Sequence, residues 1–122
     1  MASDRSPVIS IDFKTRKRIR IHKITLHLLK DPKFIQILVN PERKAIALRA
    51  GNPGDPLSLR INQRAFADNS YEVCSLGLAE SLMHLYEDWE EGKSYRIYGE
   101  FIEKEEITVF YIRNMTEIRE AR

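Results

Sequence analysis

A pattern of strand, helix and hairpin occurs twice in this chain, and it restricts the possible folds more than any other feature. In the first copy, apolar residues alternate over 19–22, an apolar stripe covers 24–29, and two apolar segments flank a turn at 40–44. The second copy runs from 71 to 113 in the same order. A βαββ unit of this size cannot bury its own apolar face, so we expect the two copies to share one core.

The length of 122 residues is that of one domain, which we expect to span residues 1–122. The first repeat is expected over about 8–49 and the second over about 71–113. A linker rich in Gly and Pro, over about 50–56, separates them. The predicted fold is α+β and rich in β-structure. In it, two βαββ repeats form one swapped-hairpin-like β-barrel core with two short helices.

Several segments carry more specific expectations. Residues 34–39 are almost continuously apolar, which is typical of a strand covered on both faces. The second helix is predicted over 76–89, because its leucines and Trp89 recur on one face of a 3.6-residue period. One strand is predicted over 95–102, and residues 116–122 form a polar tail.

Composition excludes several classes of protein. No apolar run approaches the length of a membrane span, and the first residues contain no hydrophobic signal segment, so a cytoplasmic protein without membrane contact is expected. Cys74 is the single cysteine, which excludes an internal disulfide and a cysteine metal cluster. The spacing of His22, His27 and His84 suggests no metal site either, and no cofactor is expected.

The net charge of +2 hides a strong asymmetry between the two halves. Residues 1–64 hold 14 Lys and Arg against 5 Asp and Glu, whereas residues 65–122 hold 6 against 13. One interpretation is a basic surface that binds a polyanion. The other is that opposite charges steer the two repeats into contact. The second half is also rich in aromatic residues, which indicates core packing or a protein interface.

The segment 14–23 is the best candidate for a binding site. Ile19 and Ile21 alternate with cationic residues, so this strand is predicted to have one apolar and one cationic face. A cationic face of this kind neutralises phosphates and releases their counterions. The alternative is a solvated edge strand whose charges prevent aggregation. The candidate DNA-binding residues are Lys14, Arg16, Lys17, Arg18, Arg20 and Lys23.

The first repeat also resembles a known family. Ile19 and Ile21 match the first strand, 24–29 the helix, and 35–48 the hairpin of the AbrB/SpoVT and MraZ group of bacterial transition-state regulators. Their unit is a looped-hinge, or swapped-hairpin, βαββ, and MraZ-type proteins carry two such units in one chain. The resemblance covers most of 16–49 and, more weakly, 71–113. In these regulators Arg residues on the equivalent strand and loop contact DNA, which implies Arg16, Arg18 and Arg20 here.

We therefore expect a small protein that binds duplex DNA, a transcription regulator of the AbrB/MraZ type. The alternative is a non-enzymatic protein-interaction or assembly module on the same fold, encoded by a phage or mobile element and binding no nucleic acid. Such a module would bind a second copy or another protein through the acidic, aromatic-rich half. An enzyme is not expected, because the acidic cluster at 87–91 has no nucleophile or base nearby in sequence.

Overall fold

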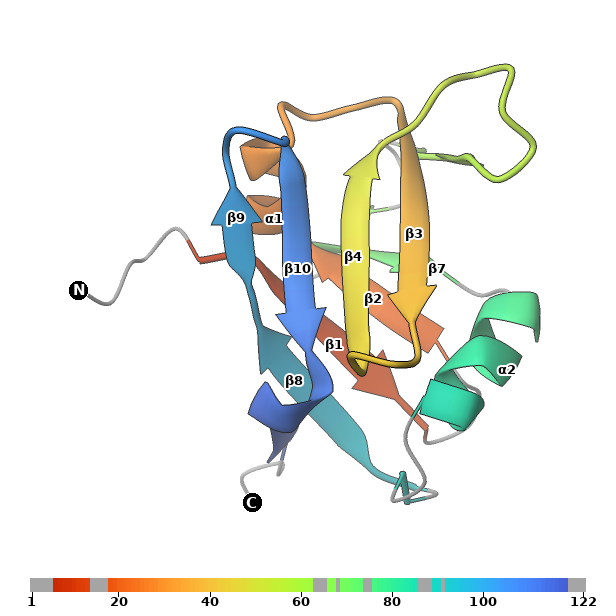
Figure 1. The fold of residues 1–122 in the computed structure, drawn as a ribbon, viewed down its shortest axis with the longest axis vertical. Coiled ribbons are helices and arrows are strands. Elements are labelled where there is room, and N and C mark those ends of the chain that lie inside the picture. The colour runs from red at the N-terminus through yellow and green to blue at the C-terminus, as the bar shows by residue number, and fades with distance from the viewer. Residues whose placement is uncertain are drawn as a thin grey trace.

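The structure is a computed structural model, which describes residues 6–13, 18–62, 66–67, 69–73, 76–85, 89–90 and 92–118. Its strands form two antiparallel sheets (Figure 1). Sheet A contains, in spatial order, β11 (Met115–Ile118), β8 (Ser94–Tyr98), β1 (Val8–Asp12), β2 (Arg18–His22), β7 (Ser70–Val73) and β6 (Phe66–Ala67). Sheet B contains β5 (Leu59–Arg60), β3 (Phe34–Asn40), β4 (Ala45–Ala50), β10 (Ile107–Tyr111) and β9 (Glu100–Ile102).

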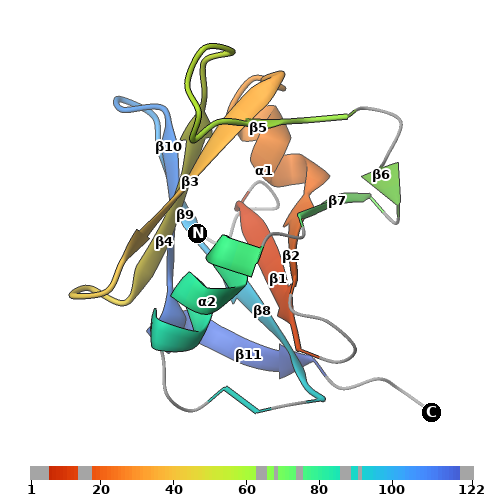
Figure 2. The same cartoon turned by 90° about the vertical axis from the view of Figure 1, so that its right-hand side faces the viewer.

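The core lies between the two sheets, which form the two layers seen edge-on in Figure 2. Sheet A contributes fully buried isoleucines on β1, β2 and β8, and sheet B contributes Ile35, Ile46 and Phe110. The helices α1 (Lys23–Leu28) and α2 (Leu76–Leu85) lie between the layers at different ends, and Leu82 of α2 is 1% exposed. Each large side chain buried in this way contributes about 1.5–3 kcal/mol.

The β-rich α+β class with two short helices is confirmed. Both halves run strand, helix and hairpin, as β2-α1-β3-β4 and as β7-α2 followed by β8, β9 and β10. The single closed barrel is not found. The strand pairings of the described residues divide into two sheets that end on short strands, and none of these pairings joins one sheet to the other.

The predicted strand over 95–102 is divided at Gly99. Its first part is β8 in sheet A, and its second part is β9 in sheet B, so the chain crosses between the layers at this glycine. A Cβ atom at position 99 would collide with the carbonyl oxygen of Val109 and the ring of Phe110. Alternation alone gave no sign of this crossing, because β8 and β9 keep the apolar period of one strand.

Two further expectations in the C-terminal half are wrong. Helix α2 spans Leu76–Leu85 and does not include Trp89, its predicted last residue; residues 86–88 lie outside the described residues. Trp89 packs instead on Phe13 and Tyr95, with ring centroids 4.9 and 5.1 Å apart, and its Nε1 donates to the Leu82 carbonyl. The expected polar tail contains strand β11, which pairs with β8. The aromatic residues of the second half thus serve largely as core.

Replacement of Gly99 by Ala tests the crossing point. The added methyl group meets backbone and a buried ring, so we expect a loss of about 1–3 kcal/mol in the free energy of unfolding. Gly54→Ala is the matched control, because nothing lies within 4 Å of its added methyl group and we expect a change of less than about 1 kcal/mol. Urea unfolding of both variants measures the difference. Equal stabilities of the two variants would contradict the close approach of Gly99 to Val109 and Phe110.

Candidate nucleic-acid interface

The outer face of sheet A, which points away from the core, is polar. Strand register places Arg96 of β8 beside Ser10 of β1, Ser10 beside Arg20 of β2, and Arg20 beside Glu72 of β7. Residues two positions apart along a strand lie on the same face of the sheet, so this surface also includes the residues that alternate with these on β1, β2 and β8. We call it the arginine face and define it by Ser10, Asp12, Arg18, Arg20, His22, Glu72, Arg96 and Tyr98.

The alternation predicted for β2 is confirmed. Ile19 and Ile21 are 0% exposed and face the core, whereas Arg18, Arg20 and His22 are half-buried on the opposite side. Strand β2 lies inside sheet A, paired with β1 on one side and β7 on the other. The alternative of a solvated edge strand is therefore wrong, and the cations of β2 have another role.

Arg18 is held by two carboxylates. Its Nε and Nη2 donate to Oδ2 of Asp12 at 3.1 and 2.9 Å, and its Nη1 donates to Oε1 of Glu72 at 2.8 Å. The second oxygen of Asp12 accepts from Ser94 Oγ at 2.9 Å. The hydrogen bond to Asp12 raises the pKa of Arg18 above its ordinary value. Arg18 therefore joins the basic half to the acidic half, as the docking interpretation of the charge asymmetry predicts.

Arg20 and Arg96 differ from Arg18. Over the part of the chain that the structure describes, neither guanidinium forms an ion pair or a side-chain hydrogen bond. The Nε atom of Arg96 is buried and has no hydrogen-bond partner. Buried donors are rarely left unsatisfied in folded proteins. Two cations without a counterion thus flank Ser10 on neighbouring strands.

His22 completes this group. Its Nε2 lies 2.9 Å from Ser10 Oγ, and the residue also begins helix α1 as its N-cap. Burial lowers the pKa of His22, and the positive charges of Arg96 and Arg20 lower it further. The ring is therefore neutral at pH 7. The effect of both guanidiniums on one imidazole indicates that the three side chains share one electrostatic environment.

The remaining candidate residues are placed only in part. Lys23 is the first residue of α1 and is exposed, and its backbone N–H donates to the Asn69 carbonyl at 2.8 Å. Lys14, Arg16 and Lys17 lie outside the described residues. Sequence patterns missed Arg96 as a partner of this site. Its alternation with Tyr95 and Ile97 gives it a polar side, but nothing in the sequence tells that β8 pairs with β1.

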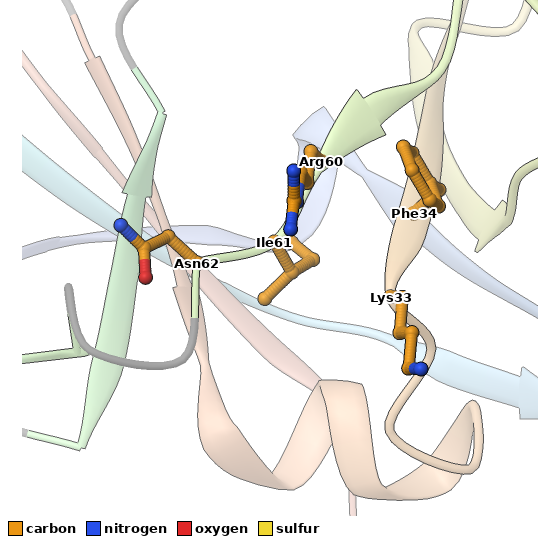
Figure 3. Close-up of a pocket in the computed structure, with 5 residues that line it drawn as sticks. All are labelled: Lys33, Phe34, Arg60, Ile61 and Asn62. Atoms are coloured by element: carbon orange, nitrogen blue, oxygen red, sulfur yellow. The ribbon is translucent and has the colours of Figure 1, made fainter. Parts of the chain in front are cut away.

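A separate cavity of about 860 Å³ lies at the start of β3. Figure 3 shows Arg60 and Phe34 on facing strands, with Lys33 below Phe34 and Asn62 beyond Ile61. Lys33 and Arg60 are exposed, so solvent screens their charges more than it screens the half-buried Arg20 and Arg96. The lining residues that the structure describes contain no acid–base pair.

Of the other sites considered in the sequence, Cys74 and residues 87, 88 and 91 of the acidic cluster lie outside the described residues. No three His, Cys, Asp or Glu side chains of those ranges gather in a way that could hold a metal ion. His27 contacts Asp31 at 2.8 Å on an exposed surface. None of the helices in the described ranges has the length and apolar character needed to cross a membrane.

The contrast between Arg18 and Arg20 is testable by stability. Arg18→Ala leaves the carboxylate of Asp12, whose side chain is 9% exposed, without its main partner. We expect a loss of about 1–3 kcal/mol in the free energy of unfolding. Arg20→Ala removes no ion pair of the described residues and is expected to change stability by less than about 0.5 kcal/mol. Chemical unfolding of both variants gives the comparison, and similar losses would show that Arg20 is structural as well.

Comparison of the chain with protein-family models, with curated proteins and with solved structures finds no match. The resemblance to the AbrB/SpoVT and MraZ regulators therefore stays a prediction from element order. What this protein does has to be inferred from the side chains of the arginine face.

Proposed function

We propose that this protein binds duplex DNA through the arginine face, as a small transcription regulator of the AbrB/MraZ type. The observation that carries the proposal is the pair of half-buried guanidiniums, Arg20 and Arg96, which have no counterion among the described residues. Neighbouring cations without counterions create a positive potential that attracts anionic ligands. DNA phosphates are such a ligand, and Arg binds them through paired hydrogen bonds.

The spacing of the two arginines also supports binding to the phosphate backbone of DNA. Arg20 and Arg96 lie one strand on either side of Ser10, with neighbouring strands about 4.8 Å apart. Both cations are half-buried, Ser10 between them is 5% exposed, and Tyr98 on the same face is 54% exposed. Contacts from such a surface to phosphates fix the position of a duplex without reading its sequence.

The order of the strands in the two sheets supports a swapped-hairpin arrangement of the two βαββ units. The first strands of the two units, β2 and β7, pair with each other, and so do their last strands, β4 and β10. Two βαββ units that share one core in a swapped-hairpin arrangement would place equivalent strands side by side in this manner.

Salt dependence of DNA binding tests the proposal. We expect the full chain to bind a duplex of mixed sequence with a log affinity that falls linearly with log salt concentration. Each lost phosphate contact reduces the slope by about 0.9, so Arg20→Gln combined with Arg96→Gln should reduce it by about 2. Fluorescence anisotropy over a salt series measures both slopes.

Lys33→Gln combined with Arg60→Gln is the matched control. Both residues are exposed beside sheet B, and their loss changes the net charge by the same amount. The control should keep the wild-type slope. The proposal fails if the wild-type chain does not bind at low salt, or if both double variants weaken binding equally.

A second candidate function is supported by the outer face of sheet B. A groove of about 540 Å³ crosses it, and its lining includes Leu38, Ala47, Ile102 and Val109. Strand β3 was predicted to be covered on both faces, but no described element covers this side, as Figure 1 shows from the front. An exposed apolar groove of this kind marks a protein contact.

The occupant that fits best is a second copy of the chain. Arg43 and Arg113 lie at one end of this face, and the acidic turn 103–106 follows β9 at the other. A two-fold axis would set the basic end of one copy against the acidic end of the other, so the surface is complementary to itself. The proposed surface then includes strands of both halves, not the acidic half alone.

Light scattering after size exclusion tests self-association. We expect the wild-type chain to form dimers at micromolar concentration and Val109→Asp to be monomeric, because the substitution buries a charge in the groove. Leu57→Asp adds the same charge at a position that is 75% exposed and should leave the dimer intact. A wild-type chain that stays monomeric at all concentrations would exclude this second function.

A further inference from the structure

The centre of the arginine face has the composition of a site for a single oxyanion. Arg96 and Arg20 occupy the strands on either side of Ser10, so their long side chains can converge above its hydroxyl. Neither is neutralised by a described residue, and the buried Nε of Arg96 is a donor without an acceptor. An acceptor supplied by a ligand would satisfy it.

The nearby carboxylates are already engaged. Asp12 accepts from Arg18 and from Ser94, and Oε1 of Glu72 accepts from Arg18. Among the described residues, both carboxylates thus pair with Arg18, although Glu72 lies beside Arg20 in the strand register.

The chemistry of the donors selects the ligand. Two guanidinium groups present planar pairs of N–H donors, which match the oxygens of a phosphate group. The Ser10 hydroxyl adds one further donor, and a protonated His22 leaves that hydroxyl free to donate to the anion, because His22 Nε2–H then donates to Ser10 Oγ. The tetrahedral oxygens of a phosphoryl group can accept from both guanidiniums at once, whereas a planar carboxylate matches a single guanidinium.

We propose that Arg20, Arg96, Ser10 and His22 form a discrete site for one phosphoryl group, and that binding of the anion is coupled to protonation of His22. The site rests on the proposed function in so far as this phosphoryl group belongs to the DNA backbone. A free phosphate or phosphate monoester presents the same oxygens but carries up to two negative charges, whereas a phosphodiester of the DNA backbone carries one.

The direction of the coupling follows from the surroundings of His22. The charged and titratable groups of the same face are Arg18 and Arg20 on β2, Asp12 on β1, Arg96 and Tyr98 on β8 and Glu72 on β7, and Lys23 of α1 follows His22 in the chain. Of these, Arg96 and Arg20 act on the pKa of His22. Without an anion, burial and the two unpaired arginines keep the pKa of His22 low. A bound dianion reverses the effect of the arginines and raises this pKa, so binding takes up a proton. Affinity for the anion therefore increases as pH falls.

Isothermal titration of the full chain with inorganic phosphate at constant ionic strength tests the site. We expect saturable binding of one anion per chain, weakened about tenfold or more by Arg20→Gln, since a charged hydrogen bond contributes at this level. Arg20→Lys should retain part of the affinity. Arg60→Gln, on the other sheet, should bind like the wild-type chain. Absence of saturable binding, or equal weakening by Arg60→Gln, would overturn the proposal.

Sulfate serves for the pH series, because it stays doubly charged where phosphate itself titrates. We expect sulfate affinity to rise as pH falls from 7 towards 5, a range that includes the ordinary pKa of His22 near 6.5, with proton uptake measured in buffers of different ionisation enthalpy. His22→Gln should abolish the uptake while keeping the arginine-dependent binding. A pH-independent affinity in the wild-type chain would overturn the coupling.

The same variants separate this site from DNA binding. If phosphate binds and depends on Arg20 but duplex DNA does not bind, the oxyanion site stands and the DNA function fails. If DNA binds and depends on Arg20 while neither phosphate nor sulfate saturates, the discrete site is overturned and the DNA function stands.

Discussion

The ion pair between Asp12 and Arg18 is the interaction on which the arginine face depends. Asp12 lies on a central strand of sheet A and is nearly buried, so its charge requires a partner within the fold. Arg18 and Ser94 supply it from the strands on either side. Because Arg18 also binds Glu72, three strands of the sheet are connected through one guanidinium.

This pairing divides the cations of the face into two kinds. Arg18 forms ion pairs within the fold, and one of its two partners, Glu72, belongs to the acidic half of the chain. Arg20 and Arg96 are placed by the same register but receive no carboxylate among the described residues. Burial lowers the pKa of His22, and the positive charges of Arg96 and Arg20 lower it further. The surplus of positive charge is thus local, which net charge alone would not reveal.

Local patterns predicted much of the fold and part of the site. The alternation of Ile19 and Ile21 with cations fixed the two faces of β2, and the turn at 40–44 fixed the hairpin β3–β4. The crossing at Gly99 and the pairing of β8 with β1 depend on contacts between residues far apart in sequence. Arg96 joins the face only through that pairing, so it could not be predicted from its own neighbours. The commitment of Arg18 to Asp12 and Glu72 has the same origin.

A map of amide chemical-shift changes on the isotopically labelled chain, titrated with duplex DNA, tests the central claim most directly. If the arginine face is the DNA-binding surface, the changes should concentrate on β1, β2 and β8 around Ser10, Arg20 and Arg96. The amides at the centre of β4 and β10, on the other sheet, should stay unchanged. Changes confined to sheet B, or no changes at a DNA concentration well above that of the protein, would contradict the account.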